Sequence, residues 1–391
     1  MSTDTTERAL LRDTARRFAR QHLPVGRTPE DFRRAHAAAG ALGLTSILLP
    51  PDPPLDTGGT CLDLVLVLEE LGAADVAFAA NAVNLPAGLA ALLARTGNPA
   101  QRALVGTGPP PLLAGALNEA DVAGSDLFCP SPGPAVGIRT SAVRQDGGGY
   151  LLNGAKCGFV TNAGVADSYL VLARTDPAAA PAQGLSMFLV PAGTPGLSCG
   201  PRTELIGWPG AHHAEVLLDD VRVGPDALVG AEHRAAGLLA GLPEMPIGLA
   251  ACFVGLARTA YEQAVTYARR RISWGRPLIE HGPVALKLAD MYVDLRTARL
   301  VVHDAARTVD DDPADAMAYG AAAAKTVAVD AAIANAQRAM EIFGGAGVAA
   351  DSPVSGLLGD AWVGYACDFT RDVLRLGIAA ALPALPQAAV R

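Results

Sequence analysis

The C-terminal part of the chain contains two segments whose residue types could do chemistry. The first is the glycine-rich run Gly344-Gly345-Ala346-Gly347, and the second is the carboxylate Asp368, which stands two residues before Thr370. A carboxylate can act as a general base, or it can cap a helix that begins just after it. A glycine run after a long helix can end that helix or let a phosphate approach the main chain. Both interpretations are open for each segment.

Two further segments, in the middle of the chain, have the composition of ligand-binding turns. Asn118 and Ser125 belong to a polar loop of small residues, which would let main-chain N–H groups approach a phosphate. An ordinary polar loop has the same composition. Phe159 and Thr161 follow Asn153-Gly154, a dipeptide typical of a tight hairpin turn. Taken alone, this second segment is also compatible with a hairpin that carries a core phenylalanine.

Basic residues gather at Arg269-Arg270-Arg271, just before Trp274-Gly275-Arg276-Pro277. The planar fork of an arginine pairs well with phosphate oxygens, although solvated arginines are also favoured at the C-terminal end of a helix. No metal site is predicted. The six cysteines form no Cys-x-x-Cys pair, and His212-His213 has no partner at metal-ligand spacing.

In order and spacing, these segments resemble the motifs of the acyl-CoA dehydrogenase family. The segment 117–126 resembles Leu-Thr-Glu-Pro-x-Ala-Gly-Ser-Asp, and 153–163 resembles Asn-Gly-x-Lys-x-x-Ile/Trp-x-Thr-Asn. The segment 271–277 is similar to Arg-x-x-Phe-Gly-x-Pro. The segment 340–370 is similar to the family's C-terminal signature, in which Gly-Gly-x-Gly, Pro-Val and Arg-Asp-Ala precede Glu-Gly-Thr. The resemblance runs from about residue 62 to 380.

The resemblance implies an α+β fold with an N-terminal helical domain, a middle β-barrel-like domain and a C-terminal four-helix bundle. It implies FAD as the cofactor, and Asp368, at the position of the family's catalytic Glu, as the base that removes a substrate's α-proton. Phe159 would stack on the flavin, Thr161 would bond near its reactive nitrogen, and Arg271 would reach the FAD pyrophosphate of a neighbouring subunit. The full set of FAD-binding residues that it implies is Asn118 (pyrimidine edge), Ser125 (pyrophosphate), Phe159, Thr161, Arg271, Gly344, Gly345 and Thr370.

The chain departs from the family pattern at the proposed base. Asp368 replaces Glu, so the carboxylate falls short by one carbon–carbon bond, roughly 1.5 Å, and Phe369 replaces Gly. A misplacement of about 1 Å can cost on the order of a hundredfold in rate. Glu244 stands beside the position where another branch of the family carries its base, but adjacent helical residues point about 100° apart. Asp368 is therefore the preferred candidate. The other departures are Gly282, Glu341 and Gly359, where the family commonly has Gln, Gln and Arg.

The bulk composition excludes several classes of protein. The formal net charge is −8 and no basic run exceeds three residues, which argues against nucleic-acid binding. No stretch of about 20 residues is apolar without Pro, Gly or a charge, which argues against a membrane span. Scattered cysteines and a polar, acidic N-terminus predict a cytoplasmic protein with reduced thiols.

Hydrophobic periodicity divides the chain into three parts. Residues 1–111 are expected to form an α-helical domain, with an apolar helical stripe at 62–71. Residues 112–228 contain short apolar runs between Gly, Pro, Asn and Asp, which predicts a β domain. Residues 229–391 return to the helical period, most clearly over 284–302, and predict an antiparallel helical bundle.

The leading hypothesis is an FAD-dependent α,β-dehydrogenation of an acyl thioester, held on CoA or on an acyl carrier protein, to the enoyl thioester. Its electrons would pass to a flavoprotein or to oxygen. The alternatives are a flavin-dependent oxygenase of the same superfamily and a non-catalytic paralogue that has lost FAD. Because Arg271 would serve a neighbour's cofactor, a homodimer or homotetramer is expected.

Overall fold

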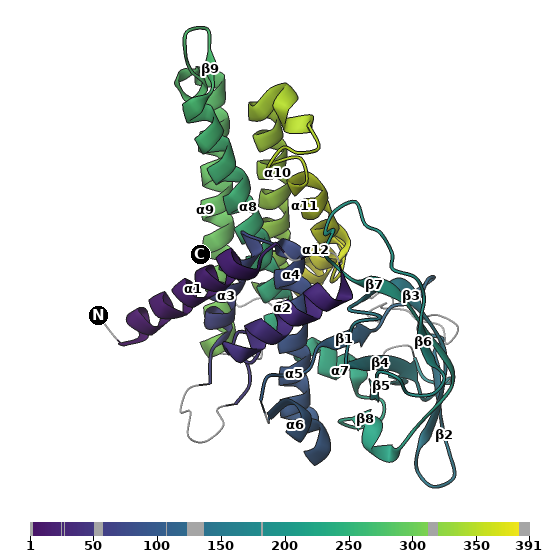
Figure 1. Cartoon of the computed structure of the whole chain (residues 1–391). Coiled ribbons are helices and arrows are strands. Elements are labelled where there is room, and N and C mark those ends of the chain that lie inside the picture. The colour runs from purple at the N-terminus through teal and green to yellow at the C-terminus, as the bar shows by residue number, and fades with distance from the viewer. Residues whose placement is uncertain are drawn as a thin grey trace.

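The computed structural model describes residues 3–24, 26, 28–50, 58–106, 108–122, 137–180, 183–311 and 320–382. Helices come first, a sheet follows, and long helices end the chain (Figure 1). This confirms the predicted α+β order of helical, β and helical parts. The bundle projects upward from the rest of the molecule in Figure 1, while the sheet forms a separate lobe at its base.

The N-terminal part is all helical, and local capping explains where its helices begin. Thr60 and Asp63 form a capping box at the start of α3, which satisfies two main-chain N–H groups that would otherwise lack partners. One stretch, Val76–Thr96, is long and apolar enough to cross a membrane, but 94% of its most apolar window is buried in the protein. The helices are α1 (Thr3–His22), α2 (Pro29–Ala41), α3 (Cys61–Gly72), α4 (Val76–Phe78), the π-helical segment η1 (Ala79–Asn84), α5 (Leu85–Thr96) and α6 (Pro99–Gly106).

The middle part is a mixed sheet of eight strands within the described residues. The strand order is β6-β7-β3-β2-β4-β5-β8, and β1 pairs in parallel with β4. Strands β3 and β7 form a long antiparallel pair within the sheet. The strands are β1 (Leu113–Ala116), β2 (Ser141–Arg144), β3 (Tyr150–Thr161), β4 (Ser168–Arg174), β5 (Leu185–Pro191), β6 (Leu197–Cys199), β7 (His213–Val223) and β8 (Leu228–Val229).

The tight turn predicted at Asn153-Gly154 is wrong. Both residues lie inside β3, at a shift in the register between β3 and β7. Gly154 adopts a φ of 150°, and the Asn153 amide exchanges two hydrogen bonds with Asp220 on β7. The sequence signal was therefore that of a β-bulge, which needs the same glycine freedom as a turn. The turn itself lies earlier, between β2 and β3, where Gln145 and Gly149 are hydrogen-bonded.

The C-terminal part is built on three long helices, α8, α9 and α10. On α9 the predicted positions Leu288, Met291, Leu295, Ala298 and Val302 are buried, and Val284, the first of the predicted stripe, is half-buried. Gly344, with a φ of 59°, ends α10, in a positive-φ conformation that glycine adopts without steric cost. The elements are α7 (Ala235–Ala240), α8 (Glu244–Arg270), the hairpin β9 (Ile272–Ser273) and β10 (Arg276–Pro277), α9 (Gly282–Asp311), α10 (Ala322–Phe343), α11 (Leu357–Ala366) and α12 (Arg371–Ala381).

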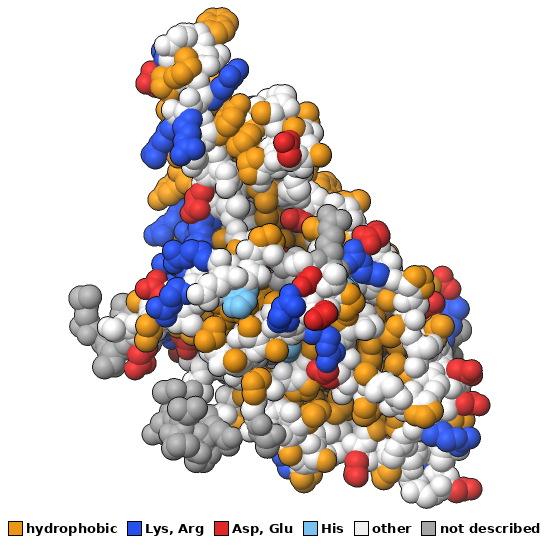
Figure 2. All heavy atoms as spheres, viewed as in Figure 1, with side chains coloured by type: hydrophobic (Ala, Val, Ile, Leu, Met, Phe, Trp, Pro, Cys, Tyr) orange, Lys and Arg blue, Asp and Glu red, His pale blue; other side chains and the backbone are white. Residues whose placement is uncertain are grey.

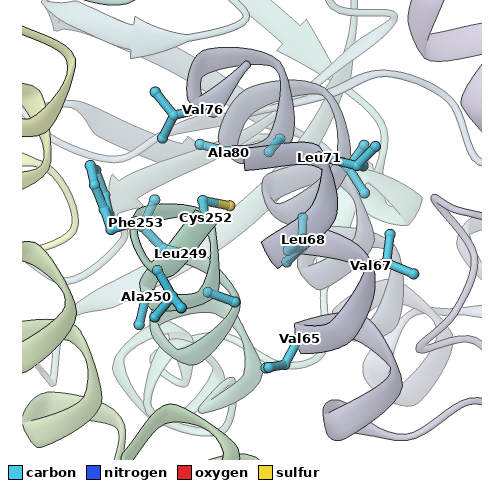
Figure 3. Packing of buried hydrophobic residues seen from close by; sticks show 14 of the residues in the cluster. Val65, Val67, Leu68, Leu71, Val76, Ala80, Leu249, Ala250, Cys252 and Phe253 are labelled. Carbon is cyan, nitrogen blue, oxygen red and sulfur yellow. The ribbon is translucent and has the colours of Figure 1, made fainter. Parts of the chain in front are cut away.

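Helices α3 and α8 lie side by side (Figure 3), and their main chains approach closely at two glycines. A Cβ added at Gly72 would lie 2.4 Å from the carbonyl oxygen of Cys252, and one at Gly255 would lie 2.4 Å from that of Glu69. Side chains such as Leu68 and Phe253 close the core around this contact. The two glycines thus fix the N-terminal part against the bundle.

Beside this contact, two neighbouring glutamates of α3 lie among basic side chains. Arg299 pairs with Glu69 at 2.7 Å, and Arg258 and Arg12 pair with Glu70 at 2.8 and 2.6 Å. Desolvation alone would raise the pKa of these carboxyls. Hydrogen bonds and charges from the surrounding basic groups outweigh it and lower each pKa to about 2.

Candidate active site

Asp368 lies in the short connection between α11 and α12. Asp368 and Phe369 both have left-handed main chains, with φ values of 46° and 73°, a conformation that costs energy for any residue but glycine. Asp368 is exposed at the surface of the chain. Protein nevertheless surrounds it closely enough that desolvation raises the pKa of its carboxyl, against an opposing effect of Lys325. A carboxylate that is both accessible and easily protonated suits a general base.

The capping interpretation of Asp368 is not supported by the local geometry. The N-cap position of α12 belongs to Thr370, whose carbonyl accepts the first helical hydrogen bond, from Leu374. Glu244, the other carboxylate considered for the base, is buried and pairs with Arg95 at 2.6 Å. Asp368 therefore stays the preferred candidate.

A buried lysine binds the main chain of the segment that carries Asp368. The ammonium group of Lys325, on α10, donates hydrogen bonds to the carbonyl oxygens of Cys367, Asp368 (3.2 Å) and Phe369 (2.6 Å). The Lys325 side chain is almost fully buried. Sequence reasoning missed this contact, although Lys325 is the one charged residue in the alanine-rich stretch 321–329.

The loss of the family's Arg at Gly359 has a structural reason. A Cβ at Gly359 would lie 2.4 Å from the carbonyl oxygen of Ile206, and one at Gly207 would lie 2.4 Å from the carbonyl carbon of Gly359. The loop before β7 thus packs directly on the main chain of α11. The Trp208 main-chain N–H donates to the Asp360 carboxylate at 2.6 Å, and its indole N–H donates to the Asp360 carbonyl at 3.1 Å.

Burial of Asp360 in this contact affects its titration. Desolvation raises the pKa of its carboxyl to about 6, although the hydrogen bond from Trp208 acts in the opposite direction. The contact also connects the sheet to α11, which leads into the segment that carries Asp368. His213, which lies 6.3 Å from Trp208 between ring centroids, is the strand partner of Thr161.

The middle part presents the predicted flavin-binding residues of β3 at its surface. Phe159 is 64% exposed, so its ring is free to stack on a planar ligand, and Thr161 is half-buried two residues further along β3. Asn118 is exposed, and its carbonyl accepts a hydrogen bond from the N–H of Cys157. Ser125 lies outside the described residues.

Next to Asn118, a buried ion pair fixes the loop. Lys156 of β3 lies 3.2 Å from the Glu119 carboxylate. Glu119 also accepts hydrogen bonds from the N–H groups of Arg139 and Thr140, both at 2.8 Å. Desolvation lowers the pKa of Lys156 to about 8, although Glu119 acts in the opposite direction. Glu119 therefore links the described residues 119 and 139–140, and Lys156 anchors it to β3.

Thr370, the N-cap of α12, lies two residues after Asp368, whereas Arg271, Gly344 and Gly345 lie at the other end of the bundle. Arg271 ends α8 and is exposed at the base of the β9–β10 hairpin, and the hairpin forms the tip of the projecting bundle in Figure 1. Gly344 and Gly345 have open space where a Cβ would be. Glu341, at a position where a negative charge would disfavour a dinucleotide, pairs with Lys287 and accepts a hydrogen bond from Gln337.

Within one chain, these residues form two separate groups. Helix α11 packs on α8 at Phe253, and Arg271 follows 18 residues later, roughly 27 Å along the helix at 1.5 Å per residue. Phe343, next to Gly344, stacks on Tyr267 near that far end of α8. Asp368 and Thr161 therefore belong to one group, and Arg271, Gly344 and Gly345 to the other.

Comparison with known proteins identifies the chain's family. Models of the acyl-CoA dehydrogenase N-terminal, middle and C-terminal domains match residues 5–106, 116–221 and 238–382. Cyclohex-1-ene-1-carbonyl-CoA dehydrogenase of Geobacter metallireducens is 33% identical over 84% of this chain and 85% of that protein. The short-chain specific acyl-CoA dehydrogenase of Megasphaera elsdenii is 31% identical over 81% of each.

The solved structures agree. Butyryl-CoA dehydrogenase from Megasphaera elsdenii superposes with a TM-score of 0.86 at 29% identity, covering 96% of this chain and 98% of that one. A chain from a study of the electron transferring flavoprotein of Acidaminococcus fermentans gives a TM-score of 0.85 at 28% identity, with 98% of each chain covered. The chain belongs to the acyl-CoA dehydrogenase family.

This membership makes the chain an FAD-dependent oxidoreductase, as the sequence predicted. The described residues fit the cofactor. Phe159 offers an exposed ring face, and Gly344 and Gly345 leave room for close approach of a ligand to the main chain. The individual FAD contacts stay predictions.

Proposed function

We propose that the protein catalyses α,β-dehydrogenation of an acyl-CoA thioester, with Asp368 as the general base. The observation that carries the proposal is the Asp368 carboxylate, which is exposed, easily protonated and carried on the segment that follows α11. Helix α11 also contacts the loop before β7, next to the strand that bears Phe159 and Thr161. These positions support a base and a flavin on opposite sides of one substrate.

In the reaction, the α-carbon loses its proton to a carboxylate oxygen of Asp368, and the α,β double bond forms as the β-carbon loses a hydride. Bound FAD would accept that hydride. Thr161 would donate a hydrogen bond where negative charge develops on the ring. The raised pKa of Asp368 helps it to retain the proton until the product leaves.

The test is the rate of flavin bleaching by a CoA thioester in a single turnover. Asp368→Asn should bind FAD and abolish bleaching, because an amide cannot accept the proton. Asp372→Asn is the matched control, since Asp372 is an exposed carboxylate of α12 in the same region, and it should react like the parent. If Asp368→Asn bleaches as fast as the parent, Asp368 is not the base, and oxygen consumption with an external reductant then tests the oxygenase alternative.

The relatives suggest the substrate and the electron acceptor. Two of them act on short-chain and cyclohexene carboxylic CoA esters by name, so we expect a short or cyclic acyl group on CoA. Butyryl-CoA and cyclohex-1-ene-1-carbonyl-CoA are the probes, each compared with the same acyl group on a carrier protein. We expect an electron-transferring flavoprotein, rather than oxygen, to reoxidise the flavin, in a cytoplasmic setting.

We also propose a homodimer or homotetramer. Trp274, at the tip of the β9–β10 hairpin, is 95% exposed, and Leu286, Val293 and Leu300 recur every seven residues as an exposed apolar line on α9. Figure 2 shows basic side chains along the same projecting bundle. A neighbouring subunit would cover the apolar line and receive Arg271. Light scattering that gives a monomer at micromolar concentration with FAD present would contradict this.

A further inference from the structure

Lys325 is held in an unusual way for a buried cation. Taking an ammonium group out of water is costly unless its donors find partners. Its three donors meet three consecutive main-chain carbonyls, those of Cys367, Asp368 and Phe369. Hydrogen bonds from a charged donor are roughly twice as strong as neutral ones. The lysine therefore binds the segment that carries the proposed base, and it does so without touching that base's carboxylate.

The segment that Lys325 holds is strained. Two successive residues other than glycine have positive φ values, and such a conformation costs energy and persists only where its surroundings enforce it. Two of the three carbonyls that bind Lys325 belong to these residues. The lysine is thus a direct reason why the left-handed conformation, and with it the direction of the Asp368 side chain, is kept.

Lys325 is also the charge that acts on Asp368. Among the described residues, the thiols of Cys252 on α8 and of neighbouring Cys367 also interact electrostatically with Asp368. Desolvation raises the pKa of both thiols far above neutrality, to about 12 for Cys367, so they stay uncharged. Asp330 and Arg371, which flank Lys325, pair with each other at 2.8 Å.

We propose that Lys325 is a positioning residue of the dehydrogenation: by binding three consecutive carbonyls, it fixes the main chain of the segment that carries Asp368. The inference rests on the function proposed above. It adds a second residue, on another helix, without which the short carboxylate would not be held at its working position.

The test uses the FAD-loaded enzyme and the rate of flavin bleaching by butyryl-CoA as a function of pH. Lys325→Met should lower the rate on the order of a hundredfold, as a displacement of about 1 Å would, and should move the acidic limb of the profile to higher pH. Lys325→Arg keeps the charge and should leave that limb at the parent's position. A purely structural role would lower the rate but leave the limb in place.

Two further variants keep the test decisive. Lys325→Gln retains a donor for the carbonyls while removing the charge, so it tests the limb shift if Lys325→Met does not fold. Arg338 lies on α10, as Lys325 does, and pairs with Asp294 of α9. Arg338→Met removes this cation, and the pH profile of its bleaching rate should match that of the parent. If Asp368→Asn is inactive but Lys325→Met and Lys325→Gln keep the parent's acidic limb, the inference is wrong and the proposed base survives. If Asp368→Asn stays active, the proposed base itself fails.

Discussion

Replacing Gly359 by alanine is expected to destabilise the protein, although alanine is the better helix former. Gly359 lies in α11, where the exchange alone would gain about 1 kcal/mol. The added Cβ, however, would lie 2.4 Å from the carbonyl oxygen of Ile206. Because real Cβ atoms do not approach an oxygen so closely, the loop that carries Ile206 and Trp208 must move away from α11.

The cost follows from the hydrogen bonds that such a movement breaks. Losing the bond from the Trp208 N–H to the Asp360 carboxylate costs roughly 1.5–3 kcal/mol, and losing the indole bond to the Asp360 carbonyl costs roughly 0.5–1.5 kcal/mol. After subtraction of the helix gain of about 1 kcal/mol, the net loss is on the order of 1–3.5 kcal/mol. The family's Arg at this position should be worse still.

Urea unfolding followed by tryptophan emission measures this loss. Trp208 is 4% exposed, whereas Trp274 is 95% and Trp362 is 45% exposed, so a red shift before global unfolding would report mainly the release of the loop. Gly377→Ala is the control, because it makes the same exchange in α12 with no atom within 4 Å of the new Cβ. If Gly359→Ala is as stable as Gly377→Ala, the direct packing of the loop on α11 is refuted.

Three other predictions concern stability. Gly255→Ala should lose about 1–3 kcal/mol in the same urea assay, because its Cβ would meet the main chain of α3 at 2.4 Å. The pKa of Glu69 is lowered to about 2, so its contribution is complete above pH 4.5 and disappears as the pH falls toward 2. Melting temperatures should drop over that window by less in Glu69→Gln than in the parent, because only Glu70 of the pair still titrates there in the variant. The pKa of Asp360 is raised to about 6, so its ionised form opposes folding. As the pH rises from about 4 to 6, the parent should lose stability, and Asp360→Asn should not show this loss. If the variant loses stability with the same slope as the parent, the assignment is wrong.

The order of helical, β and helical parts could be predicted because the spacing of apolar residues along the chain differs between helices and strands that bury one face. The buried positions of α9, such as Met291 and Val302, follow directly from it. Asn153-Gly154 could not be placed, because a turn and a bulge need the same glycine and only the pairing with β7 separates them. The candidate base was visible as a motif position, whereas Lys325 was not, since its partners are main-chain carbonyls and main-chain atoms leave no mark in a sequence.

The separation of the predicted FAD contacts into two groups at opposite ends of the bundle has a thermodynamic consequence. If Arg271 of one subunit completes the cofactor site of the next, then assembly and flavin retention are linked equilibria, and each must strengthen the other by the same factor. Dilution would then release flavin as well as subunits, and added FAD would restore both. Cofactor loss on dilution would in that case be a reversible property of the assembly, set by protein concentration.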